Sequence, residues 1–152
     1  MIKAAIFDWG YTIHDHKNDL IFPEAVFLFE DLKKKGIVLI LISRARDVEE
    51  RWNEFKEFNM KDVFQEMDVV PHESAKEFMS VLNKIKVKPQ ETIIVGDRVK
   101  SEILEGNKIG AHTIWFRNGK FADEFAETDE EKPDYTITSF NEVMPIVDKL
   151  TS

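Results

Sequence analysis

Four polar side chains that suit phosphate chemistry accompany the apolar runs of this sequence: Asp8, Ser43, Lys76 and Asp97. Two carboxylates can hold a hard cation such as Mg²⁺, which prefers oxygen ligands. A hydroxyl and an amine can bind phosphate oxygens and balance their charge. A carboxylate can also attack phosphorus and form an aspartyl-phosphate, which divides one difficult displacement into two easier steps. The four side chains predict phosphate chemistry if the fold brings them together.

The elements that must position these side chains are short apolar runs that alternate with helical patterns. Strands are expected at 2–7, 37–42, 67–70, 92–95, 113–116 and 135–137. Strands separated by helices form a parallel sheet with right-handed crossovers. The fold class is therefore α/β, a doubly wound, Rossmann-like sandwich of three layers. In such sheets ligands bind at the carboxyl ends of the strands, near the point where the strand order reverses.

The helices are delimited by caps and stops. One is expected from Pro23 to Gly36, and one begins at Asp47, which can cap it. A third follows Glu73, with Ala75 buried and Lys76 in its first turn. The last two are expected at 100–108 and from Ser139, where Glu142 completes a capping box.

Composition limits the class of protein. A chain of 152 residues with 43% hydrophobic content is expected to form one domain over 1–152. It has no cysteine, and its formal net charge of −8 argues against nucleic acid or an anionic membrane as the main partner. The longest apolar run, 37–42, is too short to span a bilayer, and no secretory leader is visible. A cytoplasmic protein is the simplest interpretation.

Four segments, taken in order, resemble the motifs of the haloacid dehalogenase (HAD) superfamily. They are FDWGYT with Asp8 and Thr12, VLILIS with Ser43, HESAKEF with Lys76, and GDRVKSE with Asp97 and Glu102. The resemblance covers nearly the whole chain. The stretch between Asp8 and Ser43 holds only one loop and one helix, so the resemblance is to members without a cap domain.

The resemblance implies a role for each matching residue. Asp8 is the nucleophile and Thr12 its partner, while Ser43 and Lys76 bind the substrate phosphate. Arg44 is a further phosphate-binding candidate, with a plain charge at the entry of a helix as the alternative. Mg²⁺ is expected on Asp8, Asp97 and the backbone carbonyl of Gly10, and Glu102 is expected to orient the site from behind these ligands.

Gly10 stands where related phosphatases carry the general acid that protonates the leaving oxygen. General acid catalysis contributes about 10²–10⁴-fold, so its loss favours leaving groups of low pKa. His14, Asp15 and His16 follow on the loop beside the site and offer a substitute acid, with His14 as the first choice. The alternative is that these three form an ordinary solvated loop.

The leading hypothesis is a Mg²⁺-dependent phosphohydrolase that is slow or limited to good leaving groups. The main alternative is a non-catalytic relative that binds phosphate or a protein. A phosphorelay receiver comes last, because receivers place the phosphorylated aspartate after the third strand, which here leads into Val70 and Pro71. An open site suits a small-molecule phosphate, an exposed macromolecular phosphate, or a homo-oligomer in which a second copy forms the lid.

Overall fold

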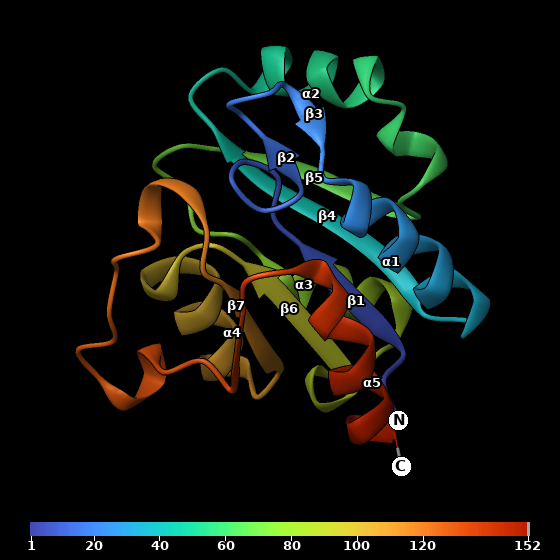
Figure 1. The fold of residues 1–152 in the computed structure, drawn as a ribbon, viewed down its shortest axis with the longest axis vertical. Coiled ribbons are helices and arrows are strands. Elements are labelled where there is room, and N and C mark those ends of the chain that lie inside the picture. Colours follow the sequence, from blue (N-terminus) through green and yellow to red (C-terminus); the bar gives the residue numbers. More distant parts are fainter. Residues whose placement is uncertain (152) are drawn as a thin grey trace.

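A six-stranded parallel sheet forms the centre of the computed structural model, which describes residues 1–151 (Figure 1). Ser152, the end of the predicted domain, lies outside the described residues. The strand order is β5-β4-β1-β6-β7-β8, so the order reverses between β1 and β6. The strands are β1 (Ala4–Phe7), β4 (Val38–Ala45), β5 (Glu66–Pro71), β6 (Thr92–Gly96), β7 (His112–Phe116) and β8 (Tyr135–Ile137).

Helices cover both faces of the sheet, which confirms the predicted three-layer α/β sandwich (Figure 1). One face packs against α1 (Pro23–Lys34), α2 (Val48–Glu57) and α5 (Val143–Thr151). The other packs against α3 (Phe78–Ile85) and α4 (Leu104–Ile109). A π-helical turn, η3 (Val99–Ile103), precedes α4; 3₁₀ turns occur at Met60–Asp62, Pro89–Glu91, Gly119–Phe121, Asp129–Glu131 and Phe140–Glu142.

Alternation along β1 shows why the sheet is buried on both sides. Ala5 and Phe7 point into the core beneath α1 and α5, whereas Ala4 and Ile6 point toward α3. A strand with apolar residues on both faces is stable only between two helical layers. Because the strand order reverses between β1 and β6, the carboxyl end of β1 lies at the reversal point.

Two expected helix starts agree with the structure. Asp47 caps α2 by accepting a hydrogen bond from the Glu50 amide at 3.0 Å. At the last helix, Glu142 accepts hydrogen bonds from the amides of Thr138 and Ser139. These polar side chains satisfy amides that have no partner inside their own helix.

The helix expected directly after Glu73 begins later, so that prediction was wrong at its start. Helix α3 starts at Phe78; Ala75 is exposed and Lys76 is buried, the reverse of the expected pattern. Here the Lys76 ammonium reaches Asp8, which follows β1, and tertiary contacts of this kind override local helix propensity.

A two-stranded antiparallel hairpin, β2 (His14–Asp15) and β3 (Leu20–Ile21), was not predicted. It connects β1 to α1 and stands beside the carboxyl edge of the large sheet (Figure 1). Over residues 1–151, every helix is too short or too polar for a membrane crossing.

Candidate active site

Three carboxylates meet at the reversal point of the sheet. Asp8 follows β1 and Asp97 follows β6, and the two strands are hydrogen-bonded neighbours in register. The Asp8 amide continues that pairing by donating to the Val95 carbonyl at 3.2 Å. Oxygens of Asp8, Asp97 and Glu102 all lie within 4.8 Å of one another. The predicted pair of strand-end aspartates is therefore part of a cluster of three acids.

The π turn η3 brings Glu102 into this cluster. Sequence reasoning expected this residue behind the metal ligands; in the structure its carboxylate lies within 4.8 Å of the Asp8 and Asp97 oxygens, and the residue is 3% exposed. Gly96 makes the space, because a Cβ at that position would lie 2.5 Å from Glu102 Cγ. π turns are rare and often occur at functional sites.

Lys76 provides the cation for the three acids. Its Nζ lies 2.8 Å from Asp8 Oδ1 and 3.6 Å from Glu102 Oε2, and its side chain is 3% exposed. Burial opposes the ammonium charge, but the two carboxylates outweigh burial and raise the pKa of Lys76. Burial likewise opposes ionisation of Asp8, yet the nearby ammonium lowers the pKa of this carboxyl. Asp8 is thus held ionised, the form that a nucleophile requires.

The other two carboxyls, those of Asp97 and Glu102, have pKa values that are raised and not lowered. Burial, followed by the charges of Asp8 and Glu102, raises the pKa of Asp97 to about 9. Burial raises the pKa of Glu102 to about 7 despite the opposing charge of Lys76. Asp97 Oδ2 and Glu102 Oε1 are buried without a hydrogen-bond partner among residues 1–151. Unpartnered carboxylate oxygens of this kind fit a hard divalent cation.

We expect a divalent cation to stabilise this cluster, increasingly so at higher pH. Without the cation, Asp97 and Glu102 hold protons in the folded chain that the unfolded chain releases above its ordinary carboxyl pKa. The free energy of unfolding should therefore fall as pH rises from about 4 toward 9. Because the cation displaces those protons, the rise in Tm on adding Mg²⁺ should grow from about pH 6 to about pH 9.

Thermal melts with and without Mg²⁺ across that pH range measure this prediction. Asp97→Asn should abolish the Mg²⁺ shift, while Asp129→Asn, a change at an exposed side chain outside the cluster, should leave it intact. A shift that survives in Asp97→Asn would show that the cation binds elsewhere.

Two other predicted residues lie beneath the site. Thr12 is fully buried, with its Oγ1 3.5 Å from Asp97 Oδ1. Ser43 is also fully buried, and its hydroxyl accepts a hydrogen bond from Arg51. Arg44 lies further out, where its Nη2 donates to Ser101 Oγ at 2.6 Å and so connects β4 with η3.

A cavity of about 810 Å³ opens above the carboxylates. Of the residues predicted from the sequence, seven line it: Asp8, Gly10, His16, Arg44, Lys76, Asp97 and Glu102. Sequence reasoning did not single out Arg51, Lys120 or Phe121, which line it as well. Arg51 lies on α2 three residues after Val48, and this helical spacing is the one signal that could have indicated it.

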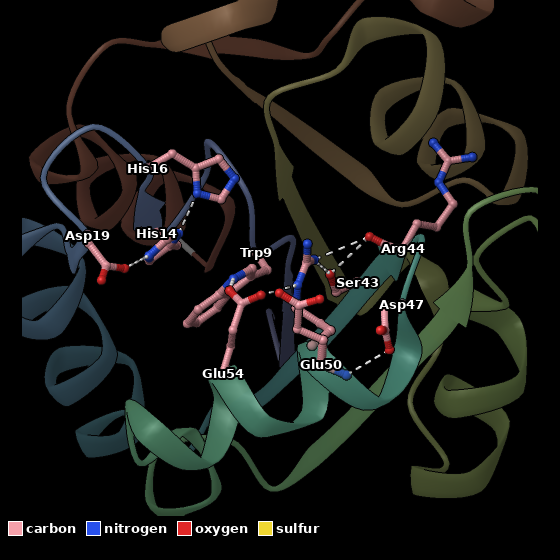
Figure 2. Close-up of polar contacts among 10 residues, drawn as sticks. Trp9, His14, His16, Asp19, Ser43, Arg44, Asp47, Glu50 and Glu54 are labelled. Atoms are coloured by element: carbon pink, nitrogen blue, oxygen red, sulfur yellow. Dashed lines mark hydrogen bonds and ion pairs between the residues drawn. The ribbon is translucent and has the colours of Figure 1, made fainter.

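His16, rather than His14, stands at the vacant side-chain position of Gly10. A Cβ on Gly10 would lie 3.1 Å from His16 Nε2. His14 is buried behind it, stacked on Trp9 at 4.9 Å and hydrogen-bonded through Nδ1 to His16 at 2.6 Å (Figure 2). The expected order of the two histidines is therefore reversed, since only His16 lines the cavity.

Comparisons with known proteins agree with this geometry. Residues 74–143 match a family model described as HAD-hydrolase-like. Over 123 residues the chain is 29% identical to the glyceraldehyde 3-phosphate phosphatase of Pyrococcus furiosus, which covers 78% of this chain and 50% of that enzyme. This chain thus spans about half the length of that relative.

Solved structures share the whole architecture. A protein from Listeria monocytogenes serotype 4b superposes with a TM-score of 0.79 at 19% identity, covering 99% of both chains. A haloacid dehalogenase-like family hydrolase from Xanthomonas campestris gives a TM-score of 0.77 at 11% identity, covering 98% of this chain and 96% of the other. At such identities the likeness shows the fold.

Proposed function

Because the chain belongs to the haloacid dehalogenase superfamily, we propose that it is a Mg²⁺-dependent phosphohydrolase that forms an aspartyl-phosphate at Asp8. One observation carries the proposal. The ionised Asp8 carboxylate lines an open cavity, with the Lys76 ammonium 2.8 Å away. Asp97 and Glu102 each have one buried oxygen without a hydrogen-bond partner in the part of the chain that the structure describes. One edge of the sheet then carries a nucleophile (Asp8), an ammonium that can bind phosphate (Lys76) and carboxylates that can hold a metal ion.

The reaction follows from these side chains. An oxygen of Asp8 attacks phosphorus while Lys76 neutralises phosphoryl oxygens, and the bond from phosphorus to the leaving oxygen breaks. Water then hydrolyses the aspartyl-phosphate and returns phosphate and the free carboxylate. Asp8, Asp97, Glu102 and the Gly10 carbonyl are the groups that would hold Mg²⁺, which supplies charge stabilisation for the phosphoryl group when bound.

The substrate class is proposed as a phosphate ester or acyl phosphate that reaches an open cavity. The relative from Pyrococcus furiosus is named for an ester of a small sugar, which supports a small-molecule substrate. The cavity also leaves access for a phosphate on a larger molecule. We expect the chain to act in the cytoplasm, which is consistent with the absence of cysteine.

Hydrolysis is expected to slow steeply as the pKa of the leaving group rises. Gly10 offers no carboxyl to protonate the leaving oxygen, and the pKa of His16 is lowered by burial and by His14, so its imidazole is neutral near pH 7. Values of kcat/KM for acetyl phosphate, 4-nitrophenyl phosphate and a sugar phosphate, measured with Mg²⁺, give the order. Equal rates across this series would show that another group donates a proton.

A non-catalytic binding module is the second candidate, and Gly10 is the observation that favours it. Beryllium fluoride mimics an aspartyl-phosphate and distinguishes the two. The proposed enzyme should bind it with Mg²⁺ at Asp8, and Asp8→Asn should eliminate both the adduct and turnover. A chain that binds phosphate reversibly but forms no adduct and hydrolyses no ester would be a binding module.

A further inference from the structure

Arg51 occupies the corner between β4 and α2, beside the residues that end the strand. Its Nη1 donates hydrogen bonds to Ser43 Oγ and, at 3.2 Å, to the Arg44 carbonyl. Glu54 Oε1 lies 3.4 Å from Arg51 Nε, and the Arg51 side chain is only 17% exposed. Figure 2 shows Ser43 and Arg44 at the end of β4, opposite Glu50 and Glu54 on α2. These contacts fix the guanidinium in one position.

The guanidinium covers the hydroxyl that the family resemblance assigns to phosphate. Ser43 is fully buried and does not line the cavity, whereas Arg51 lines it together with Asp8. A phosphate that enters the cavity therefore meets the guanidinium before the hydroxyl. Guanidinium groups bind phosphate in a bidentate, charge-assisted manner that a serine hydroxyl cannot match.

The binding capacity of Arg51 is not exhausted by its protein contacts. Its Nε is buried and makes no hydrogen bond within residues 1–151, although the Glu54 carboxylate lies 3.4 Å from it as an ion-pair partner. A buried donor without a partner is costly, and a ligand oxygen that completes it removes the cost. The fixed guanidinium is thus prepared for an anion.

Arg51 lines the same cavity as Gly10 and His16. His16 in turn stands at the position that a side chain on Gly10 would take. The guanidinium, anchored at Ser43, therefore shares one cavity with the place of the missing acid.

We propose that Arg51 is a catalytic residue that hydrogen-bonds the transferring phosphoryl group and the departing oxygen on the Gly10 side of the cavity. The inference rests on the phosphohydrolase activity proposed above. As Asp8 forms its bond to phosphorus, the leaving oxygen departs with the bonding electron pair as an anion and later takes a proton from water. Arg51 transfers no proton; its charge stabilises the anion that an acid at position 10 would have neutralised.

A series of aryl phosphates whose phenols differ in pKa tests this role. Arg51→Gln should lower kcat/KM by about tenfold for the best leaving group and about a hundredfold for the poorest, because the poorest develops the most charge. Arg51→Lys should restore part of the loss. Lys56→Gln, which removes one charge from the exposed side of the same helix, should match the unsubstituted chain for every ester.

A structural clamp on Ser43 would give a different pattern. It would lower all rates by one common factor, leave the dependence on leaving-group pKa unchanged in both Arg51 variants, and overturn the inference alone. An unsubstituted chain that hydrolyses none of the esters would overturn the proposed function and this inference together. Arg51→Lys keeps the charge and length of the side chain, so the test does not depend on the fold of Arg51→Gln.

Discussion

Gly10→Asp should increase hydrolysis of alkyl phosphates by up to about a hundredfold, because it restores a carboxylic acid beside the leaving oxygen. The substitution leaves the backbone carbonyl in place, so the expected cation ligand is kept. Gly10 is not among the glycines with positive φ, so the backbone imposes no left-handed strain on a new side chain. The neighbouring Tyr11 does have a left-handed backbone, with φ of 59°, but its conformation is already part of the fold.

The space beside Gly10 also permits the change. The nearest atom to a new Cβ is His16 Nε2 at 3.1 Å, and it belongs to a side chain on the short hairpin. A shift of a few tenths of an ångström relieves that contact. The new carboxylate then lies against an imidazole that can share its proton.

The measurement is kcat/KM on an alkyl phosphate such as glycerol phosphate, with Asp8→Asn as the blank. Gly10→Asn is the matched control, since it has the same shape and no acid. A folded, Mg²⁺-binding Gly10→Asp chain that is no faster than Gly10→Asn would argue for the binding module.

Lys76→Met should lower the free energy of unfolding by about 3–5 kcal/mol near pH 8 without Mg²⁺, because it leaves buried acids without their cation. Turnover should disappear as well, since no ammonium remains beside Asp8. Near pH 6 the loss of stability should be smaller. There Glu102, whose pKa is raised to about 7, holds a proton and carries little charge, whereas near pH 8 it is largely ionised; Asp97, whose pKa is raised to about 9, is mostly protonated at both pH values.

Urea unfolding at the two pH values measures the effect. Lys84→Met is the control, because Lys84 pairs with Glu66 at a similar 2.8 Å but is 70% exposed. Exposed pairs contribute about 0–1 kcal/mol, so this variant should change little at either pH. Equal losses in the two variants would mean that Lys76 is not the cation that holds the cluster together.

The sheet and its strand-end residues were predictable because one physical rule governs both. Apolar runs between helical patterns give a parallel sheet, and parallel strands bring their last residues to the same edge. That rule placed Asp8 and Asp97 together although they are far apart in the sequence. Lys76 follows no strand; its match to a motif of the HAD superfamily predicted it at the site, and it reaches Asp8 despite the wrong start of α3.

The remaining contacts depend on side-chain reach, which periodicity does not encode. The burial of Ser43 beneath Arg51 requires a guanidinium to bend back from α2 over β4, and many surface arginines share the same spacing. The order of His14 and His16 depends on a hairpin with two-residue strands, too short for an alternating pattern to reveal. The π turn that carries Glu102 inward has no signature in sequence propensities.

The two sides of the site differ in how often their backbone hydrogen bonds are expected to open. Phe7 pairs with Val95 in the middle of the sheet, and the Asp8 amide is bonded to the same strand, so we expect this amide to exchange its hydrogen among the slowest in the chain. His16 belongs to a hairpin with two residues in each strand, and so short a hairpin is expected to open without the large sheet. The Asp8 carboxylate is therefore expected to keep its place for as long as the sheet persists, while the imidazole beside Gly10 is expected to move more often.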